Sequence, residues 1–315
     1  MTTLSIHAPA GFAEPDIAPT TALGRRVSAR LTPFVELTKP RITAMVMFST
    51  AIGYWIAVRD VSRIAAFVHA LVGTALLASG TGALNQWLER DTDALMRRTR
   101  RRPIPSGRVA PVEGLAFGAA LSALGVLELV AGTNVLAAAA GFLTCTIYLF
   151  VYTPLKRRSS ICMLAGAAAG AMPPTIGCLA ANPYFLPPVI SLFAILFVWQ
   201  MPHAYAIALM YRDDYERGGL RMLPASALYG LSAGRHIVFW SMVLVPASLT
   251  PVLFGMAGVF YAASAIVLGL AFVLRCTRLL DDPSIARART VLVASVLYLP
   301  LILIALLLTH GSVAR

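Results

Sequence analysis

The sequence predicts an all-α, polytopic membrane protein with a bundle of nine transmembrane helices. Hydrophobic residues make up 58% of the 315 residues and charged residues only 13%, whereas soluble domains carry about 25% charged residues. The mean hydropathy is +0.76. Apolar runs of about 17 to 25 residues, the length that crosses a bilayer as a helix, recur along the chain. No βαβ pattern is present.

Residues 1–33 differ in composition from the rest of the chain. They are rich in Ala, Pro and Thr, contain no long apolar run, and carry Arg25, Arg26 and Arg30 near their end. We expect a disordered cytoplasmic tail rather than a cleaved signal peptide, followed by one transmembrane domain over residues 34–315. A leader with arginines is also compatible with an organelle transit peptide, but Glu14 and Asp16 count against that interpretation.

The transmembrane helices are predicted from the apolar runs, taken in order along the chain. They cover residues 40–58, 64–88, 112–131, 134–153, 161–181, 186–211, 236–254, 257–275 and 290–309.

The distribution of basic residues tests this count independently, because Lys and Arg concentrate in cytoplasmic loops. With nine spans, 23 of the 26 Lys and Arg residues fall on the side of the amino terminus. The other side holds only Arg59, Arg63 and Arg315. We therefore predict a cytoplasmic amino terminus, an outside carboxyl terminus, and function on the cytoplasmic side, where the inner loops also hold nearly every acidic residue.

The net charge of +12 does not indicate a nucleic acid partner. The basic residues lie in short segments between apolar runs, where they orient helices and contact membrane lipid. The four cysteines are dispersed without Cys-x-x-Cys spacing, so they predict neither a disulfide nor a zinc site.

A polar cluster follows directly on the second span and organises the rest of the interpretation. Asn85, Glu89 and Asp93 are spaced i, i+4 and i+8, so at about 100° per residue they share one helix face. Oxygen donors of this kind suit Mg²⁺, which binds through a few carboxylates together with substrate phosphates. Before this cluster, Gly80 and Gly82 leave room for a neighbouring helix or a ligand to approach the backbone.

Arginines follow this cluster at positions 97, 98, 100, 101, 102 and 108. Guanidinium groups can bind phosphate through two hydrogen bonds. A basic segment beside a membrane helix that only sets topology is the alternative, but it does not explain carboxylates on the face that continues an apolar helix.

A second polar cluster lies at the end of the sixth span, on the same side. It contains Arg212, Asp213, Asp214 and Tyr215, then a glycine pair and Arg221. The two clusters are expected to close on one anionic ligand. Asp213 and Asp214 would carry a second Mg²⁺, or Asp214 would orient a Lys or Arg. An ordinary charged loop is the simpler alternative.

Two further features point toward the same end of the bundle. His203 lies inside the sixth span, where an ionisable group is a site candidate by default. It is expected to contact a metalloporphyrin iron, to take a proton, or to bond a neighbouring helix. Lys156, Arg157 and Arg158 form a third basic cluster, which binds phosphate or porphyrin propionates or anchors its loop. His69 and His236 are interpreted as structural.

These residues resemble a known family. The first cluster reads Asn85-x-x-x-Glu89-x-x-x-Asp93-x-x-Met96-x-Arg98-Thr99-x-x-Arg102-Pro103, which is similar to the first signature of the heme O synthase (protoheme IX farnesyltransferase) family, within the UbiA-type intramembrane prenyltransferases. The resemblance extends to residues 37–41, 152–158, 166–177, 202–203 and 213–224. Tyr211 and Tyr215 stand where quinone-type relatives have Asp, which points to the heme branch and leaves a second metal in doubt.

The resemblance implies an Mg²⁺-dependent transfer of farnesyl from farnesyl diphosphate to the 2-vinyl group of heme B, with addition of water, giving heme O. It assigns Mg²⁺ to Asn85, Glu89 and Asp93, with Asp213 and Asp214 at a second site and Tyr215 beside them. Diphosphate would be held by Arg98, Arg102, Lys156 and Arg212, and heme by His203. It further implies a bacterial inner membrane rather than a mitochondrial one, and a heme A synthase or oxidase-assembly protein as a partner.

Three rival functions remain open from the sequence. A quinone-type prenyltransferase would use an aromatic acceptor in place of heme. A transporter would carry charged residues scattered at mid-membrane depth, whereas here they cluster at one mouth. A non-catalytic heme-binding or assembly protein would bind heme without releasing diphosphate.

Overall fold

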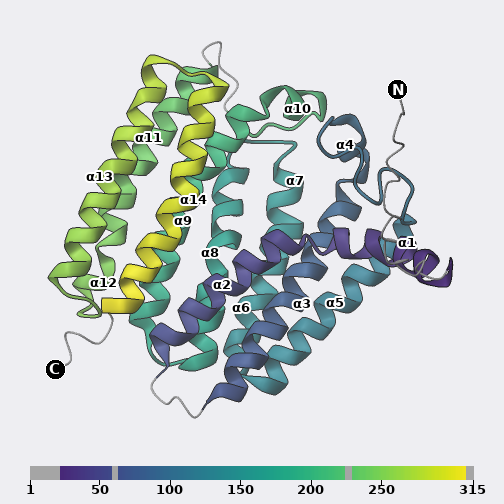
Figure 1. Ribbon diagram of the computed structural model, residues 1–315, viewed down its shortest axis with the longest axis horizontal. Coiled ribbons are helices and arrows are strands. Elements are labelled where there is room, and N and C mark those ends of the chain that lie inside the picture. The colour runs from purple at the N-terminus through teal and green to yellow at the C-terminus, as the bar shows by residue number, and fades with distance from the viewer. Residues whose placement is uncertain (1–21, 59–62, 224–228, 310–315) are drawn as a thin grey trace, which may run out of the picture.

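The computed structural model describes residues 22–58, 63–223 and 229–309, and within these ranges every regular element is a helix (Figure 1). Three helices are short or peripheral, namely α1 (Ala22–Leu37), α4 (Arg90–Leu95) and α10 (Arg212–Arg217). The others are α2 (Pro40–Ala57), α3 (Ile64–Leu88), α5 (Pro111–Gly132), α6 (Val135–Thr146) with the π-helix η1 (Ile147–Tyr152) and α7 (Thr153–Leu155), α8 (Cys162–Ala181), α9 (Leu186–Met210), α11 (Tyr229–Ser248), α12 (Thr250–Leu253), α13 (Val259–Asp281) and α14 (Ile285–Thr309). The all-α prediction is confirmed.

Eight helical segments in the described residues are long and apolar enough to cross a membrane. They coincide with the second to ninth predicted spans, with α6 to α7 and α11 to α12 each forming one segment. The first predicted span, residues 40–58, is present as α2. It has 18 residues and begins with Pro40 and Arg41, which lower its mean hydropathy. The protein is therefore a multi-pass membrane protein by its helices.

The outer surface of the bundle is apolar over much of its height. Large side chains such as Leu127, Phe150 and Val267 are exposed, and a soluble protein rarely leaves so many in contiguous patches. Exposure of these side chains to lipid, unlike exposure to water, carries no hydrophobic free-energy penalty.

Glycines set the closest helix contacts. A Cβ on Gly80 of α3 would lie 2.5 Å from Ser122 N of α5, and one on Gly177 of α8 would lie 2.0 Å from Thr50 O of α2. The backbones of these helix pairs therefore touch, as small residues allow in membrane bundles. The close α3–α5 pair confirms that Gly80 admits a neighbouring helix.

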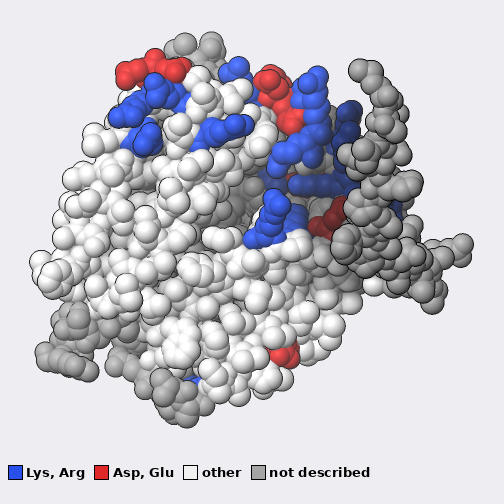
Figure 2. Space-filling model, in the orientation of Figure 1, with Lys and Arg blue, Asp and Glu red and all other residues white. Residues whose placement is uncertain are grey.

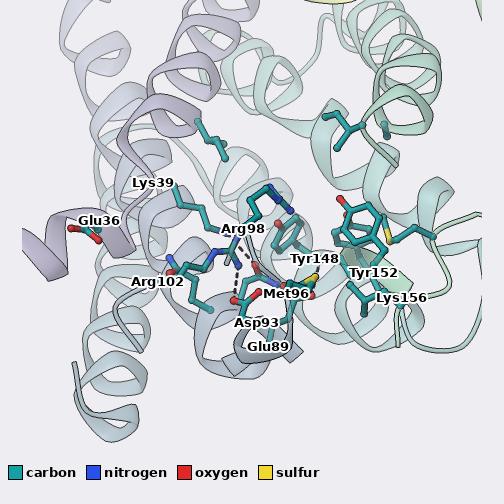
Figure 3. Close-up of a pocket in the computed structure, with 18 of the residues that line it drawn as sticks. Glu36, Lys39, Glu89, Asp93, Met96, Arg98, Arg102, Tyr148, Tyr152 and Lys156 are labelled. Atoms are coloured by element: carbon teal, nitrogen blue, oxygen red, sulfur yellow. Dashed lines mark hydrogen bonds and ion pairs between the residues drawn. The ribbon is translucent and has the colours of Figure 1, made fainter. Parts of the chain in front are cut away.

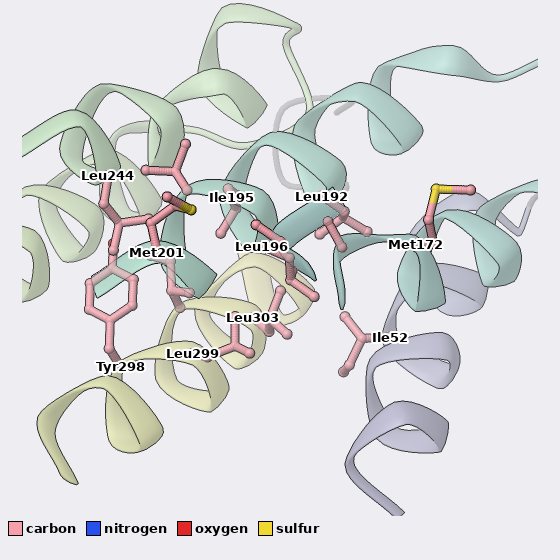
Figure 4. Packing of buried hydrophobic residues seen from close by; sticks show 14 of the residues in the cluster. Ile52, Met172, Leu192, Ile195, Leu196, Met201, Leu244, Tyr298, Leu299 and Leu303 are labelled. Carbon is pink, nitrogen blue, oxygen red and sulfur yellow. The ribbon is translucent and has the colours of Figure 1, made fainter. Parts of the chain in front are cut away.

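Helix α9 lies between the two halves of the bundle (Figure 1). Its side chains Leu192, Ile195 and Leu196 are buried toward Leu299 and Leu303 of α14 (Figure 4). One continuous apolar cluster joins α2, α8, α9, α11, α13 and α14. The polar ends of α3 and α9 line the same cavity.

The amino-terminal segment departs from the expected disorder. Residues 22–33 belong to α1, so the boundary predicted at residue 34 falls inside a helix, while residues 1–21 lie outside the described residues. The reason is anchoring, since Leu37 is fully buried and Phe34 packs with it against Ala83, Ile104 and Phe117. The disorder was predicted from the composition of residues 1–33, which contains no information about the contacts of Phe34 and Leu37.

Candidate active site

A cavity of about 550 Å³ opens at the end of the bundle where α4 and α10 lie. In Figure 2, Lys and Arg side chains gather around a recess at that end. The cavity is lined by five Lys or Arg side chains, three acidic side chains, and polar and apolar groups from α2, α3, η1 and α9. Arg63, by contrast, binds Ala181 O at 2.9 Å in the loops that join the opposite ends of the helices.

Asn85, Glu89 and Asp93 all line this cavity, and their spacing predicted that they share one helix face. Helix α3 ends at Leu88 and α4 begins at Arg90. The register survives the junction because Glu89 N donates to Asn85 O at 2.9 Å and Asp93 N donates to Glu89 O at 2.7 Å. Each is an i to i−4 bond, which keeps the three side chains on one face.

Both carboxylates are paired with basic residues from elsewhere (Figure 3). Glu89 Oε1 accepts from Lys156 Nζ at 2.7 Å, and Asp93 Oδ2 accepts from Arg102 Nη1 at 2.6 Å. The side chains of Asp93, Glu89 and Lys156 are almost fully buried. Charges this deeply buried are tolerated only when they are paired.

The two acids differ in their pKa directions. For Glu89, burial acts to raise the pKa, but Lys156, Lys39 and Arg102 outweigh it, so the pKa lies below the ordinary value. For Asp93, burial dominates over the attraction of Arg102, and Glu89 adds repulsion, so the pKa is raised. The surroundings therefore favour the charged form of Glu89 and disfavour that of Asp93.

Lys39 is a cavity residue that the sequence interpretation did not assign. Its Nζ donates to Asn85 Oδ1 at 3.1 Å, and Asn85 Nδ2 donates to Thr153 Oγ1 at 3.1 Å. Burial, with the nearby Arg102, lowers the pKa of Lys39 to about 7. Its backbone is left-handed, with φ 50°, which costs energy for a residue with a side chain. The only sequence signal was its place in the segment 37–41.

The donor set fits Mg²⁺. Asp93 Oδ1 is buried and has no hydrogen-bond partner among the described residues, and Asn85 and Glu89 line the cavity beside it. No group of three or more acidic, histidine or cysteine side chains in metal-binding proximity exists in the described part of the chain. Two carboxylates and an amide leave positions for phosphate oxygens and water, which is how Mg²⁺ commonly binds.

The π-helix η1 supplies the opposite wall. Pro154 lacks an N–H and cannot continue an α-helical ladder. The carbonyl of Tyr148 instead accepts from Thr153 N and, at 2.8 Å, from Thr153 Oγ1. The wider turn brings Tyr148 and Tyr152 into the cavity wall, with Lys156 Nζ 4.2 Å from the centre of the Tyr152 ring. Such π-turns are frequent at functional sites.

Of the four residues assigned to diphosphate, three line the cavity, namely Arg98, Arg102 and Lys156. Arg98 lies over the ring of Tyr211, 4.8 Å from its centroid. Arg212, the fourth, does not line the cavity; it pairs with Asp213 at 3.4 Å on the exposed surface.

The two aspartates expected at a second metal site do not line the cavity. Asp213 is 71% exposed. Asp214 accepts from the backbone N–H of Arg97 at 3.0 Å and of Arg98 at 3.3 Å, and pairs with Arg217. Its oxygens are therefore already used. The alternative interpretation, in which Asp214 orients a basic residue, matches the geometry.

Tyr215 is the member of the second cluster that reaches the cavity. Burial raises the pKa of its phenol, so it stays protonated and can donate a hydrogen bond. The loop after it is joined to the opposite wall, because Arg221 N donates to Lys156 O at 2.6 Å. Pro224, the end of the matched motif, lies outside the described residues.

His203 lines the cavity at its deeper, membrane side. Its Nδ1 lies 2.9 Å from Ser295 Oγ, and its ring stacks on Trp199. The other two described histidines lie away from the cavity, as expected for structural roles. His69 pairs with Glu128 at 2.8 Å, and His236 stacks on Tyr205.

Comparisons with known proteins find similar sequences over most of the chain. The sequence model of the UbiA prenyltransferase family matches residues 46–298. A protoheme IX farnesyltransferase of Solibacter usitatus is 47% identical over 278 residues, covering 85% of this chain and 95% of that protein. One of Acidiphilium cryptum is 44% identical over 291 residues, covering 88% of this chain and 90% of that protein.

Solved structures share the fold. A structure of digeranylgeranylglyceryl phosphate synthase has a TM-score of 0.74 at 18% identity, covering 91% of this chain and 99% of that chain. A UbiA homolog from Archaeoglobus fulgidus bound to GPP and Mg²⁺ has a TM-score of 0.61 at 16% identity, covering 87% and 99%. At these identities the likeness supports the helical architecture alone.

Proposed function

The chain belongs to the UbiA prenyltransferase family, and from that premise we propose that it transfers the farnesyl group of farnesyl diphosphate to the 2-vinyl group of heme B, with addition of water, releasing diphosphate and heme O. The observation that carries the proposal is the single cavity in which Asn85, Glu89 and Asp93 face the basic side chains. The 47% and 44% identities to protoheme IX farnesyltransferases favour heme as the acceptor.

The reaction begins with loss of diphosphate. The allylic C1–O bond breaks, and its electron pair leaves on the diphosphate oxygen. The vinyl π-electrons of heme then form a C–C bond to farnesyl C1, which leaves a cation beside the porphyrin ring. The oxygen of water bonds to that cation and one proton is released, so the product carries a hydroxyethylfarnesyl chain.

The basic wall binds the leaving group. Arg98, Arg102 and Lys156 face the cavity with Lys39, and together they oppose the negative charge that grows on diphosphate as the bond breaks. Preorganised charges of this kind usually contribute most to catalysis. Binding an anion also returns Lys39 toward its charged form.

Asn85, Glu89 and Asp93 would hold Mg²⁺, which supplies Lewis-acid stabilisation of the diphosphate charge when bound. Lys156 and Arg102 hold Glu89 and Asp93 in place without it. We assign no metal to Asp213 and Asp214.

The deeper walls suit the prenyl chain and the porphyrin. Tyr148 and Tyr152 line the cavity, and aromatic rings can stabilise an allylic cation through their quadrupole. Ile207 and Ala204 line the apolar part beside His203.

A transporter fits less well, because the charged groups of the cavity cluster at its mouth. An experiment must still separate heme from an aromatic acceptor, and catalysis from heme binding alone.

We propose that the cavity end faces the cytoplasm of a bacterial cell, in its inner membrane, with the carboxyl terminus outside. The supporting observation is the count of 23 basic residues against 3 across the predicted loops, because Lys and Arg concentrate on the cytoplasmic side. Heme O made there would pass to a heme A synthase or an oxidase-assembly partner. A carboxyl-terminal alkaline phosphatase fusion should be active, and a fusion in the 211–222 loop inactive; the reverse pattern would invert the topology.

The deciding experiment uses purified protein in detergent with heme B, farnesyl diphosphate and Mg²⁺. Mass spectrometry should find heme B increased by one farnesyl group and one hydroxyl group. A parallel reaction with 4-hydroxybenzoate in place of heme B should yield no product. Product from 4-hydroxybenzoate alone would transfer the assignment to the quinone type, and heme binding without diphosphate release would make the protein non-catalytic.

A further inference from the structure

His203 is held from two sides within the cavity wall. Its ring stacks on Trp199 with centroids 4.7 Å apart and an interplanar angle of 26°. Trp199 Nε1 in turn donates to Ser295 O at 2.7 Å, and Ser295 Oγ lies 2.9 Å from His203 Nδ1. One residue of α14 therefore contacts both the histidine and the ring on which it stacks.

The hydrogen bonds of Ser295 decide which ring nitrogen of His203 carries the proton. Ser295 Oγ lies 2.7 Å from Leu292 O, an oxygen that can only accept. The single hydroxyl proton is therefore given to Leu292 O, and the Ser295 oxygen accepts from His203 Nδ1–H. In a neutral imidazole this leaves the lone pair on Nε2.

Nε2 is the ring nitrogen of His203 that remains available to a ligand. His203 lines the cavity, and no hydrogen bond joins Nε2 to any described residue. The Nδ1 bond to Ser295 alone would be enough for a histidine that only joins two helices, and such a histidine would not have to line a cavity. A histidine whose second nitrogen donates to a fixed acceptor is the usual arrangement of a metal-ligating imidazole, because that bond sets ring orientation and raises basicity.

We propose that Ser295 is a positioning residue that holds His203 as the Nδ1–H tautomer, so that Nε2 ligates the iron of the heme substrate. This inference rests on the proposed function, since it presumes that heme enters this cavity. It adds Ser295 to the site and names the atom of His203 that acts. Iron ligation would hold the porphyrin in the cavity that Asn85, Glu89 and Asp93 also line.

The test measures heme binding without farnesyl diphosphate. Purified protein is titrated with heme B, and resonance Raman spectra of the ferrous complex record the iron–histidine stretch. Wild type should show this band. His203→Gly should lose it and regain histidine-type ligation when imidazole is added. Ser295→Ala should keep the band at lower frequency and bind heme about 10-fold more weakly.

Ser241→Ala is the matched control. Ser241 is as fully buried as Ser295 and donates to a carbonyl three residues earlier, Val238 O at 2.7 Å, but no described histidine bonds to it. It should leave the band and the heme affinity unchanged. A Ser295→Ala spectrum identical to wild type, or a His203→Gly protein that loses product but not its heme spectrum, would overturn the proposal. Absence of heme O from wild type would instead reject the proposed function.

Discussion

Lys156 Nζ lies 2.7 Å from Glu89 Oε1, across 67 residues of sequence, with both side chains about one-tenth exposed. The pair joins the end of α3 to the turn after α7 and places one acid and one base of the cavity in direct contact. Each residue therefore stabilises the charge of the other and also lines the cavity in which we propose that diphosphate binds.

The Lys156–Glu89 pair can be separated from catalysis by a double-mutant cycle. Lys156→Gln should destabilise the protein by about 3–5 kcal/mol, because it leaves a buried carboxylate unpaired. Glu89→Gln combined with Lys156→Gln should recover most of that loss. Neither protein should form product. Thermal unfolding in detergent measures the first effect and product formation the second; a double variant no more stable than Lys156→Gln would contradict the pairing.

Asp93→Asn is expected to abolish Mg²⁺-dependent product formation while the protein still inserts and folds. The substitution keeps the shape of the side chain but removes the charge at the buried, unpartnered Oδ1. Asp91→Asn is the control, because Asp91 lies two residues away and is 78% exposed; it should retain activity. Binding of Mn²⁺, followed by electron paramagnetic resonance, should weaken for Asp93→Asn alone.

Asp214→Asn and Asp213→Asn should behave differently although the residues are adjacent. Asp214→Asn weakens the hold on the backbone of Arg97 and Arg98, so we expect kcat/KM for farnesyl diphosphate to fall about 10- to 100-fold with the Mg²⁺ dependence unchanged. Asp213→Asn should stay within about twofold of wild type. A shifted Mg²⁺ requirement in either variant would restore the second metal site.

Acid should loosen the same contact. Burial acts to raise the pKa of Asp214, but Arg217 and the amides of Arg97 and Arg98 outweigh it, so the folded pKa lies below the unfolded one. Its contribution to stability is therefore full above the unfolded pKa and is lost as pH falls through the folded pKa. Melting temperature measured against pH should drop at the acid end for wild type and drop less for Asp214→Asn.

Glycines two residues apart on α3 should respond differently to alanine. Gly80→Ala should destabilise by about 1–3 kcal/mol, because the new Cβ would lie 2.5 Å from Ser122 N and 2.7 Å from Gly118 O. Gly82→Ala should be tolerated, since its nearest contacts would be at 3.5 Å. Melting temperatures in detergent compare them, and equal losses would contradict the close packing of α3 on α5.

The order of residues was enough to predict the transmembrane helices and the shared face of Asn85, Glu89 and Asp93. Eight of the nine predicted spans are long and apolar enough to cross a membrane, and the first is present as the less apolar helix α2. These features depend on short-range physics. A run of apolar residues long enough for a bilayer must satisfy its backbone internally, and i to i−4 bonds fix which side chains point the same way. Arg98, Arg102 and Lys156, which line the cavity, were assigned by the resemblance to a known family, which also assigned Arg212, a residue that does not line it.

Which charges meet depends on how the helices pack, and no local pattern predicted it. Asp213 and Asp214 are residue types that commonly bind metals. The partners of Asp214, however, include two backbone amides 116 and 117 residues earlier. Because every residue except proline has such an amide, the sequence could not indicate these partners. Lys39 reaches Asn85, and Ser295 reaches His203, for the same reason. Which distant groups come within about 3 Å, the length of a hydrogen bond, is set by the crossing of whole helices, which the order of side chains along one segment does not specify.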